Sequence, residues 1–473
     1  MRIIFALIAL FYLSTGNAQN KIKPDQLIED FDSLITELRS QHQGLYEYVG
    51  KTQTDHEIDS IRGTLNMPLT KLDFYKKLRY TIALTNEAHT SIDLPKATMV
   101  KFGISKSFLP LAVSLTGKEL IVTQNYGRDI NGLQKGVEII SVNGEKTSTI
   151  LDKLYPLIAT DGFNETSLQE WIGGIHFSLL YRLVYPKTKK FELQIRELNN
   201  EEVKTVTIPA IRASKFKKKN AKFRSQEFDY NQFTFEQVND SIAYLSVPGF
   251  GEDDVNYEDF YRSNFKKIDS LNIKHLIVDI QANGGGTEGN ENLLFSYLSN
   301  EVIQKYKRVT MLPKPYQKNK HKEGYIEDKW TSNDTIAKRG EYTLYTDYYS
   351  DLGYEKPSDD LIYNGKLYVL ISGQTFSGGA EFASLIKMTG RGVFIGEETG
   401  GVYEGNVSGY SEYIELSNSK IEVKIPTVHF QINVSPEIKG RGVMPDYLVP
   451  QRWEDYINGA NAKKDFAIGL ITE

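Results

Sequence analysis

The chain has 473 residues, enough for two to four domains, and its net charge is −5. Its 40% hydrophobic and 25% charged residues are typical of an ordinary soluble globular protein. The negative net charge argues against nucleic acid as a main partner. The sequence contains no cysteine, which excludes disulfides, thiolate metal sites and cysteine catalysis.

Residues 1–18 have the pattern of a secretory signal peptide. A basic start, Met1-Arg2, precedes an apolar run over residues 3–13, and Ala18 ends a stretch suited to cleavage. The apolar run is shorter than the ~20 residues that a membrane-spanning helix needs. We therefore expect an exported protein, periplasmic or secreted, with no integral membrane segment after the signal is cleaved.

Residues 19–95 are predicted to form a small helical domain. Residues 23–39 and 69–85 carry apolar side chains at helical spacing. The domain ends in the segment Asn-Glu-Ala-His-Thr at residues 86–90.

Short β-type runs begin after this domain and predict a β-rich module over residues 96–212. A helical insertion is expected within it, at about residues 150–181. The next segment, residues 213–240, is strongly basic in its first part. We interpret it as a solvated linker rather than a nucleic acid-binding patch.

Residues 241–455 alternate predicted strands and helices, a pattern typical of βαβ units in a parallel sheet. The predicted strands lie at 242–247, 275–279 and 367–371, and the predicted helices at 257–271 and 288–298 and after residue 377. A polar stretch at 314–360 is either a lid over the site or a solvated surface excursion. Residues 456–473 form a C-terminal tail.

Ser377 is the most informative residue, because it stands between a strand-like run and a helix-like segment. Such a turn exposes the hydroxyl, and the free N–H groups of the first helical turn can face a developing oxyanion. An ordinary serine N-cap is the alternative interpretation. A second glycine-rich strand end, at residues 284–286, suggests that both turns line one cleft.

Gly284, Gly286 and Gly289 also have the spacing of a dinucleotide-binding fingerprint. However, Glu288 at the helix start would repel a pyrophosphate, and the next strand, at 308–312, does not end in an acidic residue that would hold a ribose. We therefore expect no nucleotide cofactor, and no other cofactor or metal.

Four segments together resemble the tail-specific, or C-terminal processing, serine peptidases and their tricorn-core relatives. They are residues 279–286, residues 375–381, Gly-Glu-Glu-Thr-Gly-Gly at 396–401 and Gly-Arg-Gly-Val-Met-Pro-Asp at 440–446. Upstream, residues 133–145 resemble part of a PDZ-like module, and residues 41–46 and 86–90 resemble the helical N-terminal region of the tricorn-like branch. The resemblance implies an α/β protein with a crotonase-like ββα spiral catalytic core, an N-terminal helical domain and a PDZ-like β-rich module.

The resemblance also suggests the catalytic base that a serine nucleophile needs. The bacterial tail-specific branch uses a lysine shortly after its Gly-Glu-x-Thr segment, but Val402 stands at that place. His89 matches the histidine base of the tricorn-like branch, and its ordinary pKa of ~6.5 suits a base near neutrality. His429 is the reserve candidate. The remaining histidines are expected to be structural: His42, His56, His176, His275 and His321.

Two further parts of the site follow from the same resemblance. The tricorn-like pattern has a glutamate just before its Gly-Val-x-Pro-Asp segment, and Glu437 lies near that place, although Lys439 stands at the ungapped position. Glu437 is thus the predicted third catalytic residue, with a surface role as the alternative. The predicted oxyanion hole consists of the backbone N–H of Gly378 and that of Gly285 or Gly286.

We therefore predict a serine peptidase that cleaves peptides or unfolded protein tails through an acyl-enzyme. The PDZ-like module would hold an extended peptide as an added strand and read a free C-terminal carboxylate. One alternative is a non-catalytic peptide- or ligand-binding protein on the same fold, as in the family's retinoid-binding relatives. Another is a crotonase-like acyl-thioester enzyme, which the signal peptide and the PDZ-like segment disfavour.

Overall fold

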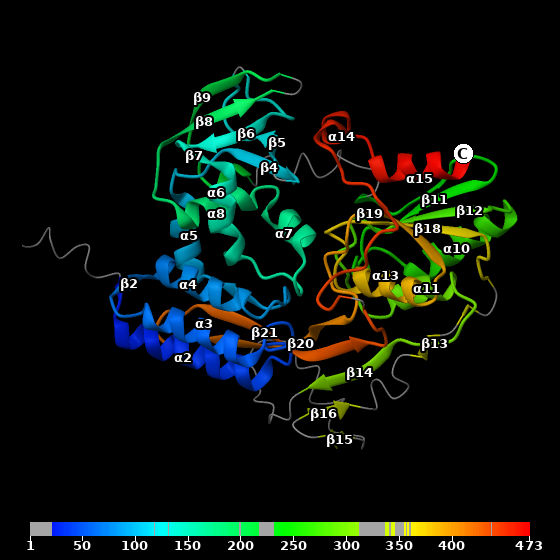
Figure 1. Ribbon diagram of the computed structural model, residues 1–473, viewed down its shortest axis with the longest axis horizontal. Coiled ribbons are helices and arrows are strands. Elements are labelled where there is room, and N and C mark those ends of the chain that lie inside the picture. Colours follow the sequence, from blue (N-terminus) through cyan, green and yellow to red (C-terminus); the bar gives the residue numbers. More distant parts are fainter. Residues whose placement is uncertain are drawn as a thin grey trace, which may run out of the picture.

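The computed structural model describes residues 21–117, 119–130, 132–197, 200–216, 231–311, 336–339, 342–345, 354–355, 357–358, 361–436 and 438–473. The predicted signal peptide, half of the predicted linker and most of the stretch at 314–360 lie outside these residues. None of the described helices is long and apolar enough to cross a bilayer. Figure 1 shows blue N-terminal helices, a cyan and green β-rich part, and a mixed α/β part that ends in red.

The N-terminal helices are α2 (Pro24–Gln41), α3 (Lys51–Gly63) and α4 (Lys71–Ala83). The predicted helices at 23–39 and 69–85 correspond to α2 and α4. Helix α3 was not predicted, because it buries only Thr54 and Ile58 and so lacks a continuous apolar stripe. A short strand pair, β1 (Lys21–Ile22) with β2 (Leu69–Thr70), joins the starts of α2 and α4.

The β-rich part is an antiparallel sheet in the order β4-β5-β6-β8-β9, with β7 paired to β6. The predicted helical insertion contains three helices and a 3₁₀ turn, and its apolar side chains pack on the sheet. Helix α5 (Lys96–Ile104), which precedes the sheet, buries none of its residues and was not predicted. The remaining bounds are β4 Leu111–Thr116, β5 Glu119–Asn125, β6 Glu138–Val142, β7 Glu145–Lys146, α6 Thr147–Leu154, η2 Tyr155–Leu157, α7 Glu165–Ile172, α8 His176–Val184, β8 Lys190–Arg196 and β9 Val203–Pro209.

The mixed part is built on a central sheet in the order β10-β11-β12-β18-β19-β22. Strands β11, β12, β18, β19 and β22 run parallel, as the alternation of strands and helices predicted, and β10 is an antiparallel edge. The bounds are β10 Thr234–Gln237, β11 Ile242–Ser246, α10 Tyr257–Ser270, β12 His275–Asp279, α11 Asn290–Ser296, β18 Lys366–Ile371, α13 Gly378–Met388, β19 Gly392–Gly396, β22 Tyr447–Leu448, α14 Trp453–Asn458 and α15 Ala462–Thr472.

Both faces of the central sheet are covered, because successive strand residues point to opposite sides. Leu276 and Val278 join the core beneath α10, α11 and α13, whereas Ile277 joins a smaller core that includes residues of α15. Continuous apolar strands of this kind are typical of buried parallel sheets. The sheet therefore supplies a rigid platform whose strand ends position the site.

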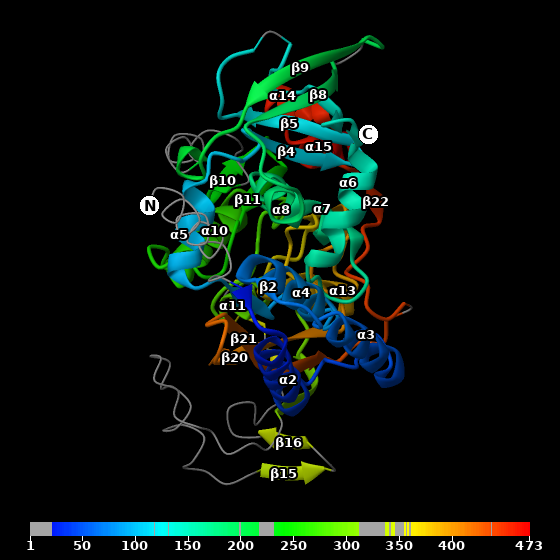
Figure 2. The same cartoon turned by 90° about the vertical axis from the view of Figure 1, so that its left-hand side faces the viewer.

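A second sheet connects the mixed part to the N-terminal helices. Its order is β15-β16-β14-β21-β20, and β3 from the N-terminal region pairs with β21. Apolar side chains of α2 and α4 pack on β21 as well, and Figures 1 and 2 show these helices beside β20 and β21. The bounds are β3 Ser91–Asp93, β14 Tyr306–Met311, β15 Ile336–Arg339, β16 Tyr342–Tyr345, β20 Gly405–Glu415 and β21 Glu422–Ile432. A separate two-stranded sheet pairs β13 (Ile303–Gln304) with β17 (Tyr354–Glu355).

A buried ion-pair network fixes the first turn of α13. Lys305 has no exposed surface, and its Nζ lies 2.8 Å from both Glu291 Oε1 and Glu381 Oε2. Tyr306 and Asn406 also donate hydrogen bonds to Glu381. Because every charge in this network has a partner, the network can be buried without an isolated ion.

Replacing Lys305 should show how strongly the fold depends on this network. Lys305→Met leaves two buried carboxylates unpaired and should lower the free energy of unfolding by about 3–5 kcal/mol. Lys387→Met is the matched control, because Lys387 pairs with Asp446 at the exposed surface and should cost at most about 1 kcal/mol. Urea unfolding followed by circular dichroism measures both, and equal effects would contradict the prediction.

Candidate active site

Ser377 lies between β18 and α13, at the strand-to-helix turn that the sequence predicted. Its backbone has φ 51° and ψ −126°, a conformation that costs a residue other than glycine about 1–3 kcal/mol. The turn is held against the segment after β12, since Thr375 Oγ1 donates to Ile280 O and Phe376 N donates to Asn283 O, each at 2.9 Å. The Ser377 side chain makes no N-cap hydrogen bond, so it is not an ordinary N-cap.

The glycine-rich turn at 284–286 packs directly on the serine. A Cβ at Gly285 would lie 2.7 Å from both Ser377 Cβ and Gly378 N, and its φ is 93°, so this position requires glycine. The Gly285 N–H is already engaged, because it donates to Asn283 Oδ1 at 2.9 Å. Within the part of the chain that the structure describes, the N–H groups of Gly286 and Gly378 have no acceptor. Both N–H groups are therefore free to donate beside Ser377.

His89 faces the serine from a different part of the chain. Its Nε2 lies 3.1 Å from Ser377 Oγ, although 288 positions separate the two residues. The His89 ring stacks on Phe376, with 4.7 Å between the ring centroids. Burial lowers the pKa of His89 below its ordinary value, which favours the neutral ring that can accept a proton.

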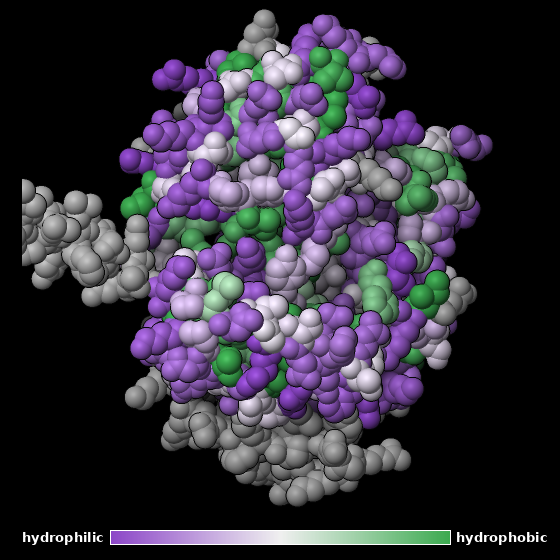
Figure 3. Space-filling view, turned by 60° about the vertical axis from the view of Figure 1, so that its left-hand side comes forward, coloured by the Kyte–Doolittle hydropathy of each residue, from purple (hydrophilic) through white to green (hydrophobic). Residues whose placement is uncertain are grey.

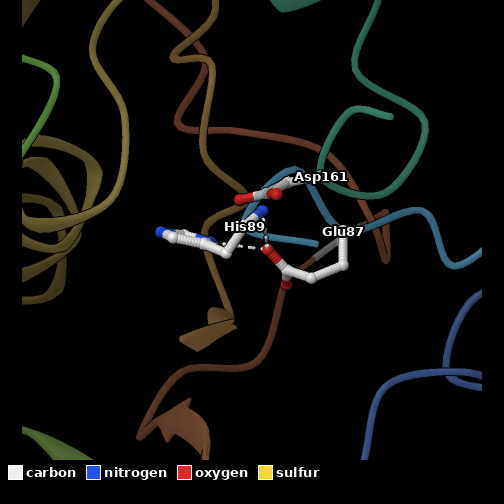
Figure 4. Close-up of side chains that lie close together, drawn as sticks. All are labelled: Glu87, His89 and Asp161. Carbon is white, nitrogen blue, oxygen red and sulfur yellow. Dashed lines mark hydrogen bonds and ion pairs between the residues drawn. The ribbon is translucent and has the colours of Figure 1, made fainter. Parts of the chain in front are cut away.

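Glu87 orients the His89 ring through the nitrogen that faces away from Ser377. Its Oε1 lies 2.6 Å from Nδ1, and its Oε2 accepts a hydrogen bond from Val407 N in β20 at 2.7 Å. Figure 4 shows the carboxylate pointing toward the ring. Burial raises the pKa of Glu87 to about 7, although the Asp161 side chain and then the N–H groups of Val407 and His89 oppose the shift. Nδ1 is therefore the protonated nitrogen whenever Glu87 is ionised, which leaves Nε2 free to accept from Ser377.

Asp161 is a second buried acid at the same place (Figure 4). Its Oδ1 accepts a hydrogen bond from Ala88 N at 2.9 Å, and one oxygen of each acid and one ring nitrogen of His89 lie within 4.8 Å of one another. Burial, and then the nearby charge of Glu87, raise the pKa of Asp161 well above its ordinary value. Because two adjacent buried carboxylates do not both ionise readily, this shift favours the neutral form of Asp161.

Three loops from different parts of the sequence brace this arrangement. Gly162 N donates to Asn86 O and Phe163 N donates to Gly440 O, while Asn164 Nδ2 donates to Thr399 O. Glu398 accepts two hydrogen bonds from Arg441 and a third from Gly442 N. The two later glycine-rich segments of the sequence thus bind each other and support the site. Val402, at the place of a lysine base in the tail-specific branch, is buried.

The ligand atoms of Glu87, His89 and Asp161 are close enough to hold a metal ion. However, Glu87 Oε1 and His89 Nδ1 bond to each other, and two of the remaining carboxylate oxygens accept backbone N–H groups. The ring nitrogen on the far side faces Ser377. The hydrogen bonds are those of a nucleophile, a base and an orienting acid, so the site is suited to proton transfer.

The other site residues and histidines considered in the sequence can now be compared with the structure. Glu437 lies outside the described residues, so its role stays a prediction, while Glu87 bonds to the nitrogen that Glu437 was expected to orient. His42 and His429 are buried, and burial lowers their pKa values to about 3 and about 4. Neither Glu87 nor Asp161 was predicted as a site residue from the sequence. Glu87 had a signal, an acid two positions before the histidine, whereas Asp161 is 73 positions from its partner Ala88 and had none.

Comparisons with known proteins give one family match and several similar solved structures. The model of peptidase family S41 matches residues 241–449, which confirms the resemblance to C-terminal processing peptidases. The crystal structure of mature CPAF has a TM-score of 0.65 at 15% identity, over 94% of this chain and 96% of its own, and so shares the overall fold. The photosystem II D1 C-terminal processing protease scores 0.40 at 15% identity, over 93% of this chain and 98% of its own. The tricorn protease has a TM-score of 0.38 at 15% identity, over 95% of this chain and 36% of its own. No curated protein sequence matches the chain.

A pair of glycine substitutions will test the close packing against Ser377. Gly285→Ala should abolish the reaction of Ser377 with a fluorophosphonate probe, because the new Cβ would collide with Gly378 N at a positive φ. Gly284→Ala is the matched control, since its Cβ would meet nothing within 4 Å. Labelling is measured by mass spectrometry of the folded variants. Equal labelling of the two would show that the turn is not sterically restricted.

Substitution of the two acids will show which one carries the negative charge. Glu87→Gln should lower the rate of Ser377 acylation on the order of 10⁴-fold near neutral pH, because Nδ1 loses its anionic acceptor. Asp161→Asn should retain most of the rate, since an amide is the neutral counterpart of a protonated carboxyl group. In the wild type, the rate should rise with pH through about 7 as Glu87 ionises. A loss in Asp161→Asn as large as that in Glu87→Gln would contradict a neutral Asp161.

The same variants give an independent measurement of stability. The pKa values of Glu87 and Asp161 are higher in the folded state than in the unfolded chain, so the folded state binds protons more tightly. Their contribution to stability is therefore present at low pH and is lost as pH rises through the folded-state pKa values. The melting temperature of Asp161→Asn should fall less with rising pH than that of the wild type.

Proposed function

We propose that this chain is a serine peptidase that uses a histidine base, because residues 241–449 match the model of peptidase family S41. The observation that carries the proposal is the 3.1 Å contact between His89 Nε2 and Ser377 Oγ at a strained strand-to-helix turn. Its substrate is a peptide or a protein.

In the proposed reaction, Ser377 Oγ attacks a peptide carbonyl while His89 Nε2 takes the hydroxyl proton. The imidazolium that forms is stabilised by Glu87, and the negative charge on the carbonyl oxygen is stabilised by the N–H groups of Gly286 and Gly378. His89 then returns the proton to the leaving amine. Water attacks the acyl-enzyme by the same route in reverse, which releases the acid product and regenerates Ser377.

Two finer features belong to the same proposal. We infer that residues 241–455 form a crotonase-like spiral core, which the parallel central sheet supports. We infer likewise that the antiparallel sheet of residues 96–212 is a PDZ-like module that binds an extended peptide by its C-terminus. Endopeptidase activity and C-terminal processing both fit this arrangement, and cleavage-site mapping distinguishes them.

We also propose that the protein is exported and acts in the periplasm or as a secreted enzyme. The support is the signal-like sequence of residues 1–18. Detection of a mature N-terminus at residue 19 in the extracytoplasmic fraction would test this.

A non-catalytic binding protein on the same fold is the competing function. It would need neither an accessible serine nor an oriented base, so the hydrogen-bonded set of Glu87, His89 and Ser377 favours the enzyme. The strained backbone of Ser377 favours it too, because such strain is typical of functional positions.

Labelling with a fluorophosphonate probe will test the proposal. We expect an adduct on Ser377 of the mature wild type, and none in Ser377→Ala. His89→Ala should reduce labelling on the order of 10³-fold or more, because the hydroxyl loses its base. His56→Ala is the matched control on the exposed helix α3 and should label like the wild type. A folded wild type that does not react would favour the binding protein.

A further inference from the structure

We propose that a pocket beside His89 binds a carboxylate group of the substrate through Arg79. This inference rests on the proposed peptidase function and names a chemical feature of its substrate. The pocket has a volume of about 170 Å³. Its lining, called here the Arg79 pocket, consists of Arg79, Ile82, Ala88, Thr90, Ser91, Ile92, residues 157–159 and Trp171.

The Arg79 pocket adjoins the catalytic residues. Ala88 and Thr90, which line it, flank His89 in the sequence. Trp171 on another wall packs edge-on against Phe376, with 5.9 Å between the ring centroids, and Phe376 immediately precedes Ser377. A substrate whose scissile bond lies at Ser377 therefore has neighbouring residues within reach of this pocket. In Figure 3 the face of the molecule is hollowed across its middle, and hydrophobic side chains line the hollow.

Arg79 is held in place but keeps binding capacity. Its Nε donates to Leu157 O at 2.9 Å, and one terminal nitrogen donates to Tyr75 Oη at 3.4 Å. Those two acceptors are neutral, and no carboxylate of the described residues lies within ion-pair distance of its guanidinium. The charge is thus fixed in position without an acidic partner.

The chemistry of the walls indicates which group would fit. Seven of the lining positions are aliphatic or aromatic, namely Ile82, Ala88, Ile92, Leu157, Ile158, Ala159 and Trp171. They reduce the screening of a charge by water, and the planar guanidinium matches a carboxylate better than any other common peptide group. The carboxylate has two sources in a peptide, an Asp or Glu side chain near the scissile bond or the free C-terminus of a chain cut close to its end.

Cleavage-site mapping followed by matched peptides will test this proposal. Peptides made from denatured proteins by chymotrypsin are incubated with the enzyme, and the cleaved bonds are identified by mass spectrometry. One good substrate is then synthesised in matched versions: Glu or Gln at the position preferred for acids, and a free or amidated C-terminus. We expect kcat/KM to be about tenfold or more higher for one carboxylate version than for its neutral counterpart.

The variants connect that preference to Arg79. Arg79→Gln should remove it, whereas Arg79→Lys should keep part of it, because the charge remains while the planar fork is lost. Lys77→Gln is the matched control, since it removes a positive charge from the same helix and lies outside the pocket lining. Melting temperatures of all variants show whether loss of the Arg79–Leu157 hydrogen bond unfolds the protein.

Each outcome has a distinct meaning. If Arg79→Gln loses a preference for Glu over Gln, the group that Arg79 binds is a side-chain carboxylate. If it loses a preference for a free over an amidated C-terminus, that group is the C-terminal carboxylate. If the wild type shows no carboxylate preference, or if Arg79→Gln retains that preference, the inference about Arg79 is overturned but the proposed peptidase function is not. A wild type that neither cleaves these peptides nor reacts with the fluorophosphonate would overturn the proposed function, and the inference with it.

Discussion

The site depends on one buried carboxylate, that of Glu87. It bonds on one side to His89 and on the other to the backbone of Val407 in β20, so it joins the N-terminal part of the chain to the C-terminal sheet. Burial of this charge would be costly without these partners. Docking β3 on β21 brings the 86–90 loop to the correct place, and the interactions of Glu87 fix the ring's orientation once it is there. The hydrogen bonds that orient the catalytic histidine therefore also hold distant parts of the chain together.

Other buried groups lower the free-energy cost of this arrangement, because they are neutral or paired. Asp161 supports the backbone of the same loop through Ala88 N, and as a neutral acid it adds no second charge. Lys305 balances Glu381 in the first turn of α13, directly after the strained serine. The strain at Ser377 persists because bonds from Thr375 and Phe376 to the neighbouring loop leave the turn little freedom.

The sequence predicted the parts of the site whose signals are local. Ser377 was identified from a strand, a glycine turn and a helix in immediate succession, and the parallel sheet from the alternation of elements. Asp161 could not be identified, because its role comes only from contact with Ala88 across 73 positions. The choice between Gly285 and Gly286 as a donor was equally hidden, since it depends on the bond from Gly285 N to Asn283 Oδ1. Helix α3 was overlooked because only one of its two buried residues, Ile58, is apolar.

The segment from Arg79 to Asp93 combines several tasks that are usually spread over a protein. Helix α4 presents Arg79 to the pocket, the following loop carries the orienting acid and the base, and β3 anchors the segment to β21. A carboxylate bound by Arg79 would therefore contact the same short segment that carries His89. The loop is already held by hydrogen bonds to Asp161 and Val407. Binding of a carboxylate would therefore restrict the motion of this loop only a little further. Substrate recognition here would act mainly by positioning the scissile bond against a base that is already oriented, which is the least costly way to convert binding energy into rate.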